Sequence, residues 1–398
     1  MKRRIALLCF TLIVSTGYAQ PLTGALTVSG YVFVDQNGNG IRDGNEPGIA
    51  GVPVSDQVNV VQTDDVGAYQ LSGLKGYGFV FISVPSGYKQ SKSFWQRVPD
   101  VQTNVKMDFA IEKIADLKEF SFIQASDTHV SEKTIDRMQK FRAVVDSVKP
   151  DFVIITGDLV RDALRVSEPE ATGYFELYRD QIKKMTIPVW SVPGNHELFG
   201  IERQTSLVNL KNPLYGRNMY HHYFGPDYYS FNFGGIHFIG LNSVDFEDLW
   251  YFGHVDSIQV EWMKKDLSMI PPNTPVVTFN HIPFYSGGLS LQNFKEFGLE
   301  RTVELEKGNL QYRHVVSNAR EMISILLHYN FSLALAGHHH SCQQFSFNFT
   351  GRQMRFEQTA AVIGPLEDGD FKFPSGVTLY HVNNGMIGKG IFIPLDKK

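Results

Sequence analysis

Five short groups of residues with metal-binding side chains occur after residue 120. The groups are Asp127-Thr128-His129, Gly157-Asp158, Gly194-Asn195-His196-Glu197, Asn280-His281 and Gly337-His338-His339-His340. Together they offer carboxylate, amide and imidazole donors, which are the ligands that a pair of divalent transition metals takes in proteins. A lone Asp or His at a strand end is more often structural than catalytic. The prediction of a metal centre therefore depends on the five groups occurring together.

Each group directly follows a short apolar run. The runs cover residues 120–125, 152–156, 189–193, 276–279 and 331–336. Apolar runs of this length are typical of strands that are buried on both faces. They predict five strands of one buried sheet, whose carboxyl ends bring the five groups to one edge. That edge is where open α/β sheets bind ligands.

Length and composition indicate an ordinary globular protein. The chain has 398 residues, of which 43% are hydrophobic and 20% charged, and this length predicts about two domains. The formal net charge is −4 and no basic run is present, which excludes a protein that coats nucleic acid. The oligomeric state stays open.

The first residues have the pattern of an export signal. Basic residues precede an apolar run from Ile5 to Val14, and small residues follow up to Ala19. We expect residues 1–19 to be a cleaved signal peptide and the mature chain to be secreted or periplasmic. The apolar run is shorter than the roughly 20 residues that span a bilayer, and no later run qualifies, so no transmembrane segment is expected.

Two regions with different patterns follow the signal. Residues 20–112 contain short apolar runs separated by turn residues, which predicts a small β-sandwich domain. The runs are 27–34, 52–55, 58–62, 68–71, 78–84 and 104–110. In residues 113–398, strands alternate with helical patterns, which predicts an α/β domain. The helical patterns are 135–148, 174–185, 260–269 and 315–327.

The β region contains a candidate calcium loop. Numbered from Asp35, oxygen ligands recur at the spacing of an EF-hand loop, with Gly40 at the sharp turn. The ligand positions are Asp35, Asn37, Asn39, Ile41 (through its carbonyl), Asp43 and Glu46. No helical pattern flanks the loop, so a calcium loop within a β domain is expected. An Asn/Gly-rich hairpin without metal is the open alternative.

The sequence around this loop carries a resemblance. The segments Gly30 to Asp35, Gly48 to Val54 and Thr63 to Tyr69 resemble the calcium-binding B-type repeats of bacterial surface proteins. They are also similar to the N-terminal β domain that precedes some exported phosphoesterases. This resemblance implies a bound Ca²⁺ and an accessory role for residues 20–112.

From residue 120 onward, the order of the five groups resembles the calcineurin-like metallophosphoesterase superfamily. The resemblance implies a four-layer fold, in which two mixed sheets form a β-sandwich flanked by helices. It also implies two metal sites and one substrate-facing residue. One metal would be held by Asp127, His129 and His340, the other by Asn195, His281 and His338, with Asp158 bridging them and His196 facing the substrate.

Two divalent metals would support phosphoester hydrolysis. With Mn, Fe or Zn bound, the expected reaction is attack of a metal-bridging hydroxide on a phosphodiester or phosphomonoester, with His196 protonating the leaving group. The substrate would be a small molecule or a surface polymer. The alternative is a surface or glycan-binding protein whose phosphoesterase domain is catalytically silent, but no ligand of the set is missing.

Three further features bear on the site. Residues 198–227 and 284–314 are long connections, and loops of this length are often functional. For any single residue, packing within the loop is the preferred interpretation of an aromatic and a solvated face that of a charge. As a group, we expect the aromatic residues and histidines of the first connection and Lys295, Arg301 and Arg313 of the second to select the substrate. His339 lies between two predicted ligands and would project away from them in an extended segment, so it is excluded from the metal set.

Overall fold

The computed structural model describes residues 26–396, except residue 75 and residues 101–103, 288–302, 307–308, 350 and 369. The expected signal peptide, Lys295 and Arg301 therefore lie outside the described residues. Among the described residues, no helix is both long and apolar enough to cross a membrane.

The N-terminal region consists of two small sheets, as expected for a β-sandwich. In β1 (Thr27–Val34), Val28 and Val32 are buried, as the alternation of a half-buried strand requires. One sheet has the order β4 (Ala68–Ser72), β1, β9 (Phe109–Lys113), β6 (Tyr88–Gln90), with β8 (Val105–Lys106) pairing β1. The other has the order β3 (Val60–Gln62), β2 (Pro53–Ser55), β5 (Phe79–Ile82), β7 (Trp95–Arg97). The short strands β6 and β7 were not predicted.

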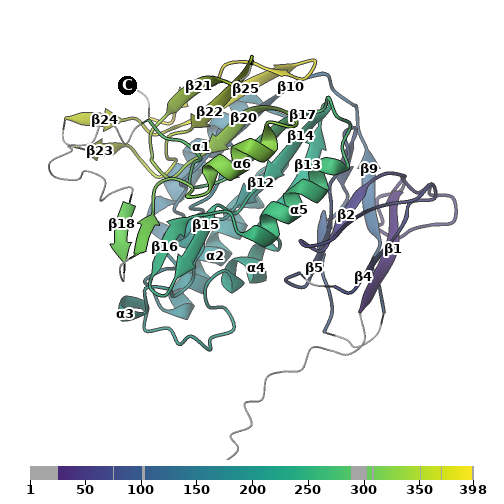
Figure 1. Ribbon diagram of the computed structural model, residues 1–398, viewed down its shortest axis with the longest axis horizontal. Helices are drawn as coiled ribbons and strands as arrows, with labels where there is room; N and C mark the ends of the chain where they lie inside the picture. Colours follow the sequence, from purple (N-terminus) through teal and green to yellow (C-terminus); the bar gives the residue numbers. More distant parts are fainter. Residues whose placement is uncertain are drawn as a thin grey trace, which may run out of the picture.

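Two larger sheets lie at the centre of the rest of the chain (Figure 1). The first has the order β12 (Val189–Val192), β11 (Phe152–Thr156), β10 (Glu119–Ala125), β25 (Gly376–Asn383), β26 (Met386–Ile387), with β27 (Ile391–Pro394) pairing β25. The second has the order β13 (Tyr229–Phe233), β14 (Ile236–Gly240), β17 (Pro275–Phe279), β20 (Asn330–Ala336), β22 (Arg352–Gln358), β21 (Gln343–Phe349). Both sheets are mixed, because parallel neighbours are joined to antiparallel strands: β25 in the first sheet, and β13 and β21 at the edges of the second.

The prediction that the five apolar runs form one sheet is wrong. Strands β10, β11 and β12 belong to the first sheet, whereas β17 and β20 belong to the second. An apolar run shows that both faces of a strand are buried, but it does not show which strands pair. The two sheets meet at their carboxyl ends, where Gln124 Nε2 at the end of β10 donates to the Ala336 carbonyl at the end of β20 over 2.8 Å.

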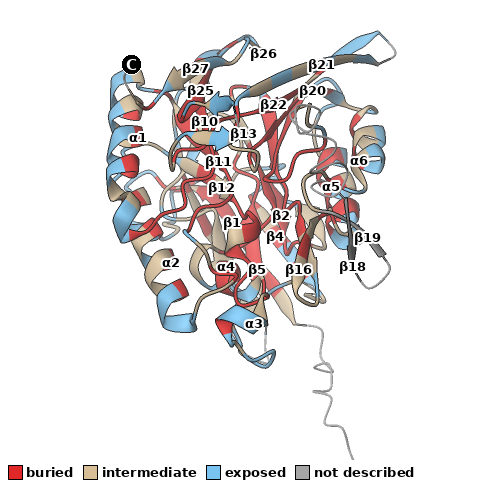
Figure 2. Cartoon of the chain, turned by 90° about the vertical axis from the view of Figure 1, so that its left-hand side faces the viewer, coloured by how far each residue is buried: buried red, intermediate tan, exposed pale blue. Residues whose placement is uncertain are grey.

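Helices cover the outer faces of both sheets. Alternate residues of β10 and β11 point in opposite directions: Phe122 stacks on Phe152 between the sheets, at a centroid distance of 5.2 Å. Ile123 and Val153 pack against the helices of the other side. Figure 2 shows buried strands between α1 and α2 on one side and α5 and α6 on the other. These helices are α1 (Ile135–Val148), α2 (Glu168–Ile182), α5 (Ser257–Ser268) and α6 (Ala319–Leu326). The expected four-layer fold is confirmed.

The two long connections contain secondary structure that the sequence did not predict. Residues 198–227 contain α3 (Arg203–Ser206) and α4 (Asn218–Phe224), and residues 284–314 contain the hairpin of β18 (Val303–Glu306) and β19 (Asn309–Tyr312). In α4, Tyr220 and His221 are buried, so these two residues do not form part of a substrate surface. A second hairpin, β15 (Val244–Glu247) and β16 (Trp250–Gly253), and a third, β23 (Leu366–Asp368) and β24 (Phe371–Phe373), complete the strands.

The N-terminal sheets are attached to the larger part through a buried interface. Gln57 Nε2 donates to Asp227 Oδ1 over 2.9 Å, and Tyr228 Oη donates to the Gln57 carbonyl over 2.7 Å. Trp262 Nε1 in α5 donates to Ser55 Oγ over 3.0 Å. One hydrophobic cluster contains buried residues of the N-terminal sheets and of the larger sheets. The two parts therefore share a continuous hydrophobic core.

Candidate metal centre

The predicted ligands lie in sharp turns at the carboxyl ends of the strands. Asp127, His129, Asp158, His338 and His340 all have positive φ, at 52°, 39°, 49°, 71° and 52°. Residues with a side chain rarely adopt this conformation, and where they do they cluster at functional sites. The backbone is thus bent at each of these positions, and the bends direct the side chains towards one centre.

Three glycines allow the ligands to approach one another. A Cβ atom on Gly194 would lie 2.2 Å from Asp158 Oδ1, and one on Gly157 would lie 2.6 Å from His281 Nδ1. A Cβ on Gly337 would lie 1.8 Å from Ser126 Oγ and 2.8 Å from Asp127 Oδ2. Each glycine therefore leaves the space that a ligand from another strand occupies, which explains why a glycine precedes three of the five groups.

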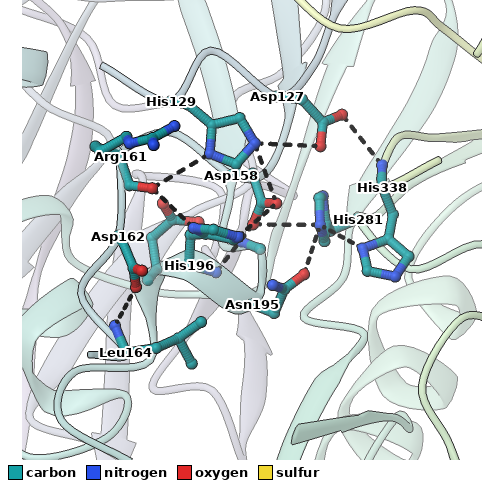
Figure 3. A network of polar contacts seen from close by, with 12 residues as sticks. Asp127, His129, Asp158, Arg161, Asp162, Leu164, Asn195, His196, His281 and His338 are labelled. Atoms are coloured by element: carbon teal, nitrogen blue, oxygen red, sulfur yellow. Dashed lines mark hydrogen bonds and ion pairs between the residues drawn. The ribbon is translucent and has the colours of Figure 1, made fainter. Parts of the chain in front are cut away.

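The structure brings the predicted ligands into two overlapping donor groups (Figure 3). One group consists of Asp127, His129, Asp158 and His340, and the other of Asp158, His281 and His338. Asp158 belongs to both: its Oδ2 lies 3.6 Å from His129 Nε2 and its Oδ1 lies 3.3 Å from His281 Nε2. Asn195 Oδ1 lies 3.1 Å from His281 Nε2 and adds an amide oxygen to the second group.

The contacts within these groups fit bound cations. Imidazole nitrogens face one another, with 3.3 Å between His129 Nε2 and His340 Nε2 and 3.1 Å between His281 Nε2 and His338 Nδ1. Asp127 Oδ1 is buried and lies 3.1 Å from His340 Nε2. Carboxylate oxygens and imidazole nitrogens thus converge on the same space, and a metal ion bound there would use their lone pairs.

Charge and burial set the ionisation of the ligands. Burial and the nearby His196 lower the pKa of His129 to about 4, so His129 offers the neutral imidazole that metals bind. Burial alone would lower the pKa of His281, but the carboxylate of Asp158 raises it to about 9. Burial tends to raise the pKa of Asp158, but the surrounding histidines, His281 first, bring it well below its usual value.

Backbone carbonyls determine which ring nitrogen faces the centre. His281 Nδ1 lies 2.8 Å from the Thr156 carbonyl, and His129 Nδ1 lies 3.4 Å from the Arg161 carbonyl. Since a carbonyl oxygen only accepts, each Nδ1 carries the proton and each Nε2 is left for a metal. His196 Nδ1 contacts the same Arg161 carbonyl at 2.8 Å, and its Nε2 lies 3.9 Å from Asp158 Oδ2.

Glu197 has a structural role that the sequence did not reveal. Its Oε1 accepts from the backbone N–H of Leu159 and Val160 over 2.7 and 2.9 Å, and its Oε2 accepts from that of Gly194 over 2.6 Å. The carboxylate thus joins the two turns that carry Asp158 and Asn195. Burial, with the charge of Asp158, raises the pKa of Glu197 to about 8. In the sequence, only its position next to His196 could have indicated a role for Glu197 at the site.

Two other residues near the ligands make contacts away from the centre. Asp162 accepts from Leu164 N and Arg165 Nη1, each over 2.9 Å. His339 Nε2 lies 2.9 Å from the carbonyl of His314, and His339 is in neither donor group. His314 also contacts a predicted ligand, and no sequence pattern singled it out.

The candidate calcium loop is closed by contacts between its own residues. Asp35 accepts from Gly38 N and Gly40 N over 2.8 and 2.9 Å, and Glu46 accepts from Gln36 N and Asp43 N over 2.8 and 3.0 Å. Asp35 and Glu46 are buried. However, the three acidic residues of the loop do not form a donor group of the kind found at the other site.

Comparisons with known proteins agree with this geometry. The chain is 24% identical over 196 residues to a "probable glycerophosphodiester phosphodiesterase GpdQ" of Arcobacter nitrofigilis, covering 46% of this chain and 65% of that protein. It is 25% identical over 168 residues to a "probable cyclic nucleotide phosphodiesterase" of Fibrobacter succinogenes, covering 40% of this chain and 56% of that protein. It is also 36% identical over 86 residues to the serine-aspartate repeat-containing protein F of Staphylococcus epidermidis, covering 20% of this chain and 5% of that protein.

The chain thus spans less than two thirds of the length of each of these relatives. Two family models match it: residues 36–114 match the N-terminal domain of calcineurin-like phosphoesterases, and residues 120–342 match the calcineurin-like phosphoesterase model. The second match covers more than half of the chain and contains all five ligand groups. The chain therefore belongs to the calcineurin-like phosphoesterase family.

Proposed function

We propose that this chain is a two-metal phosphoesterase that hydrolyses a phosphodiester. The observation that carries the proposal is the pair of donor groups that share Asp158. A carboxylate common to two such groups can hold two ions side by side, which is the arrangement of two-metal hydrolases. The ligands we assign are Asp127, His129 and His340 for one ion, Asn195, His281 and His338 for the other, and Asp158 for both.

Two divalent ions of Mn, Fe or Zn would supply Lewis-acid activation of a phosphoryl oxygen and of the attacking water. The protein supplies the charge balance around them. Two ionised carboxylates, Asp127 and Asp158, against two dications leave a centre of about +2, which attracts an anionic phosphoester. The imidazole tautomers set by Thr156 and Arg161 orient the ligands before any ion binds.

His196 is our candidate for the proton donor to the leaving group. Its Nδ1–H is held by the Arg161 carbonyl at 2.8 Å, so its Nε2 is free to exchange a proton with substrate. Its side chain is 22% exposed, whereas that of His129 is 6% exposed. An imidazole that is accessible beside the centre and fixed at its far nitrogen is suited to general acid catalysis.

The names of the bacterial relatives favour a diester over a monoester, whereas relatives from Arabidopsis thaliana and Homo sapiens are named as phosphatases. The two bacterial relatives over the phosphoesterase part are named as diesterases. A catalytically silent, surface-binding protein is disfavoured because no predicted ligand is missing and all converge on one centre. The substrate would be a small molecule or a surface polymer.

The test is hydrolysis by metal-depleted protein after reconstitution with Mn²⁺, Fe²⁺ or Zn²⁺. The substrates are bis(p-nitrophenyl) phosphate, p-nitrophenyl phosphate and cyclic nucleotides. We expect turnover of the aryl diester that requires two ions per chain. Asp158→Asn should lose both ions and nearly all turnover, because it removes the shared ligand. Wild-type turnover by this variant, or by metal-free protein, would refute the proposal.

For the N-terminal part, we propose that the loop from Asp35 to Glu46 binds Ca²⁺. The buried carboxylates of Asp35 and Glu46 and the ligand spacing support this. Calcium should raise the melting temperature of the wild-type protein, and Glu46→Gln should remove this effect. A calcium-induced shift that is equal in both proteins would favour the metal-free hairpin.

We also propose that the chain is exported through a cleaved signal of residues 1–19. The basic start, the apolar run and the small residues before Gln20 support it. Expression with a C-terminal tag in a bacterium, followed by N-terminal sequencing, should give a mature chain that begins at Gln20. An intact Met1 in the cytoplasmic fraction would contradict export.

A further inference from the structure

His338 has contacts at both of its ring nitrogens. Its Nδ1 lies 3.1 Å from His281 Nε2, on the side of the second donor group. Its Nε2 lies 2.8 Å from Nδ1 of His314, on the opposite side of the ring. The ring centroids of His314 and His338 are 5.0 Å apart and their planes meet at 30°, so the two rings lie end to end along this contact. His314 therefore contacts a predicted ligand from outside the centre.

The direction of this hydrogen bond follows from the role of His338. A neutral imidazole that offers the lone pair of Nδ1 to a metal must carry its proton on Nε2. The Nε2–H of His338 then has to be donated, and Nδ1 of His314 is the acceptor at 2.8 Å. His314 must in turn carry its own proton on Nε2. The opposite arrangement would place a proton on His338 Nδ1 and block that nitrogen for metal binding.

His314 is held in place by its own neighbours. His339 Nε2 lies 2.9 Å from the carbonyl of His314. The guanidinium carbon of Arg313 lies 4.2 Å from the ring centroid of Tyr251 and 5.2 Å from that of Trp250. On the other side, Ser317 N donates to the Gly253 carbonyl over 2.8 Å. The segment is therefore attached on both sides of His314 to the β15–β16 hairpin.

The group that accepts the ring N–H of His338 differs in kind from the groups that accept the ring N–H of two other histidine ligands. For His129 and His281 the acceptor is a backbone carbonyl, which substitution does not remove. For His338 it is a side chain from the connection between β17 and α6. Acceptors beyond a metal ligand typically raise its basicity and fix its orientation, and their loss costs about 10–100-fold in metal affinity.

We propose that His314 is a positioning residue that holds His338 in the tautomer and orientation needed to bind the second metal ion. This inference rests on the two-metal centre of the proposed function, but not on turnover. It assigns to His314, at the end of the connection of residues 284–314, a role other than substrate contact: His314 supports one of the two metal sites and leaves the other unaffected.

The test is equilibrium binding of Co²⁺ to metal-depleted protein, followed by competition with a chelator and by the visible spectrum of each bound ion. His314→Phe removes the acceptor, whereas His314→Asn offers an oxygen near the position of Nδ1. His328→Phe is the control, since His328 is exposed and outside both donor groups. The melting temperature of each metal-free variant reports folding.

In His314→Phe, we expect one Co²⁺ to bind about 10–100-fold more weakly and its spectrum to change, while the other stays unchanged. His314→Asn should restore most of the affinity, and His328→Phe should match wild type. Unchanged binding in His314→Phe, equal weakening of both ions, or His314→Asn as weak as His314→Phe would overturn the proposal. If His314→Phe does not fold, His314→Asp decides: a stronger acceptor should tighten one ion, and weaker binding would overturn it.

These outcomes are separable from the proposed function. Wild-type protein that binds two Co²⁺ ions but hydrolyses no phosphoester would refute the activity and leave the role of His314 standing. Wild-type protein that binds fewer than two ions would refute both.

Discussion

Gly194→Ala is expected to disable the centre although it adds only a methyl group and replaces no predicted ligand. The added Cβ would lie 2.2 Å from Asp158 Oδ1 and 2.3 Å from Asp158 N, whereas ordinary contacts begin at 3.4 Å. The side chain or the backbone would have to move by about 3.4 − 2.2 = 1.2 Å. The backbone at Gly194 is extended, with φ −106° and ψ −168°, so the conformation itself is accessible to alanine.

The expected loss follows from the size of this displacement. A misplacement of about 1 Å at a catalytic centre costs on the order of 100-fold in rate, which corresponds to about 2.7 kcal/mol of transition-state stabilisation. Because Asp158 would serve both ions, metal content should also fall. The assays are kcat/KM for bis(p-nitrophenyl) phosphate and elemental analysis of the purified protein.

Gly173→Ala is the matched control. Gly173 lies within α2, and its added Cβ would meet no atom within 4 Å. Alanine at such a helical position should stabilise the fold by roughly 0.5–1 kcal/mol and leave turnover unchanged. Gly194→Ala with metal content and kcat/KM within about threefold of wild type would show that Asp158 does not need its present position.

Three further outcomes are expected. His196→Asn should keep both ions but slow hydrolysis by about 10²–10⁴-fold, most for poor leaving groups; an equal loss across a series of leaving groups would argue against its acid role. Glu197→Gln should lower the free energy of unfolding by about 1–3 kcal/mol in urea titration above pH 8, where Glu197 is ionised, since an amide N–H would face Gly194 N–H, whereas Glu261→Gln on the exposed face of α5 should have little effect. For metal-free protein, the pKa of His281 is raised from 6.5 to about 9, so the stability that this histidine contributes is fully present below pH 6.5 and is lost as pH rises through 9. Urea titrations at both ends of this range should show the loss, and His281→Asn should reduce it.

The chemistry of the site could be predicted from the sequence because it depends on residue type and local order. Donor residues follow apolar runs, and strand ends are where such runs stop, so the groups were predicted to meet at one edge. The structure brings Asp127, Asp158, His281 and His340 together there. Consecutive apolar residues in a run also indicate that both faces of the strand are buried. Phe122 and Ile123, for example, belong to the hydrophobic clusters on opposite faces of β10.

The pairing of the strands was decided only by the tertiary structure. A run that is apolar on both faces fits any central strand, so nothing local distinguished one sheet of five strands from two sheets that meet at their carboxyl ends. The role of single residues in the connection of residues 198–227 also depends on the fold. The aromatic residues of this connection indicate burial or binding equally well, and Tyr220 and His221 are buried.

The supporting contacts of the site are also a property of the fold. Glu197 was visible beside His196, but its three backbone donors come from two different turns. His314 lies 24 residues before its partner His338, and no spacing rule connects them. Residue types within one short segment therefore determine which atoms can bind a metal. The atoms that orient those ligands come from distant segments, and only long-range packing decides where such segments lie.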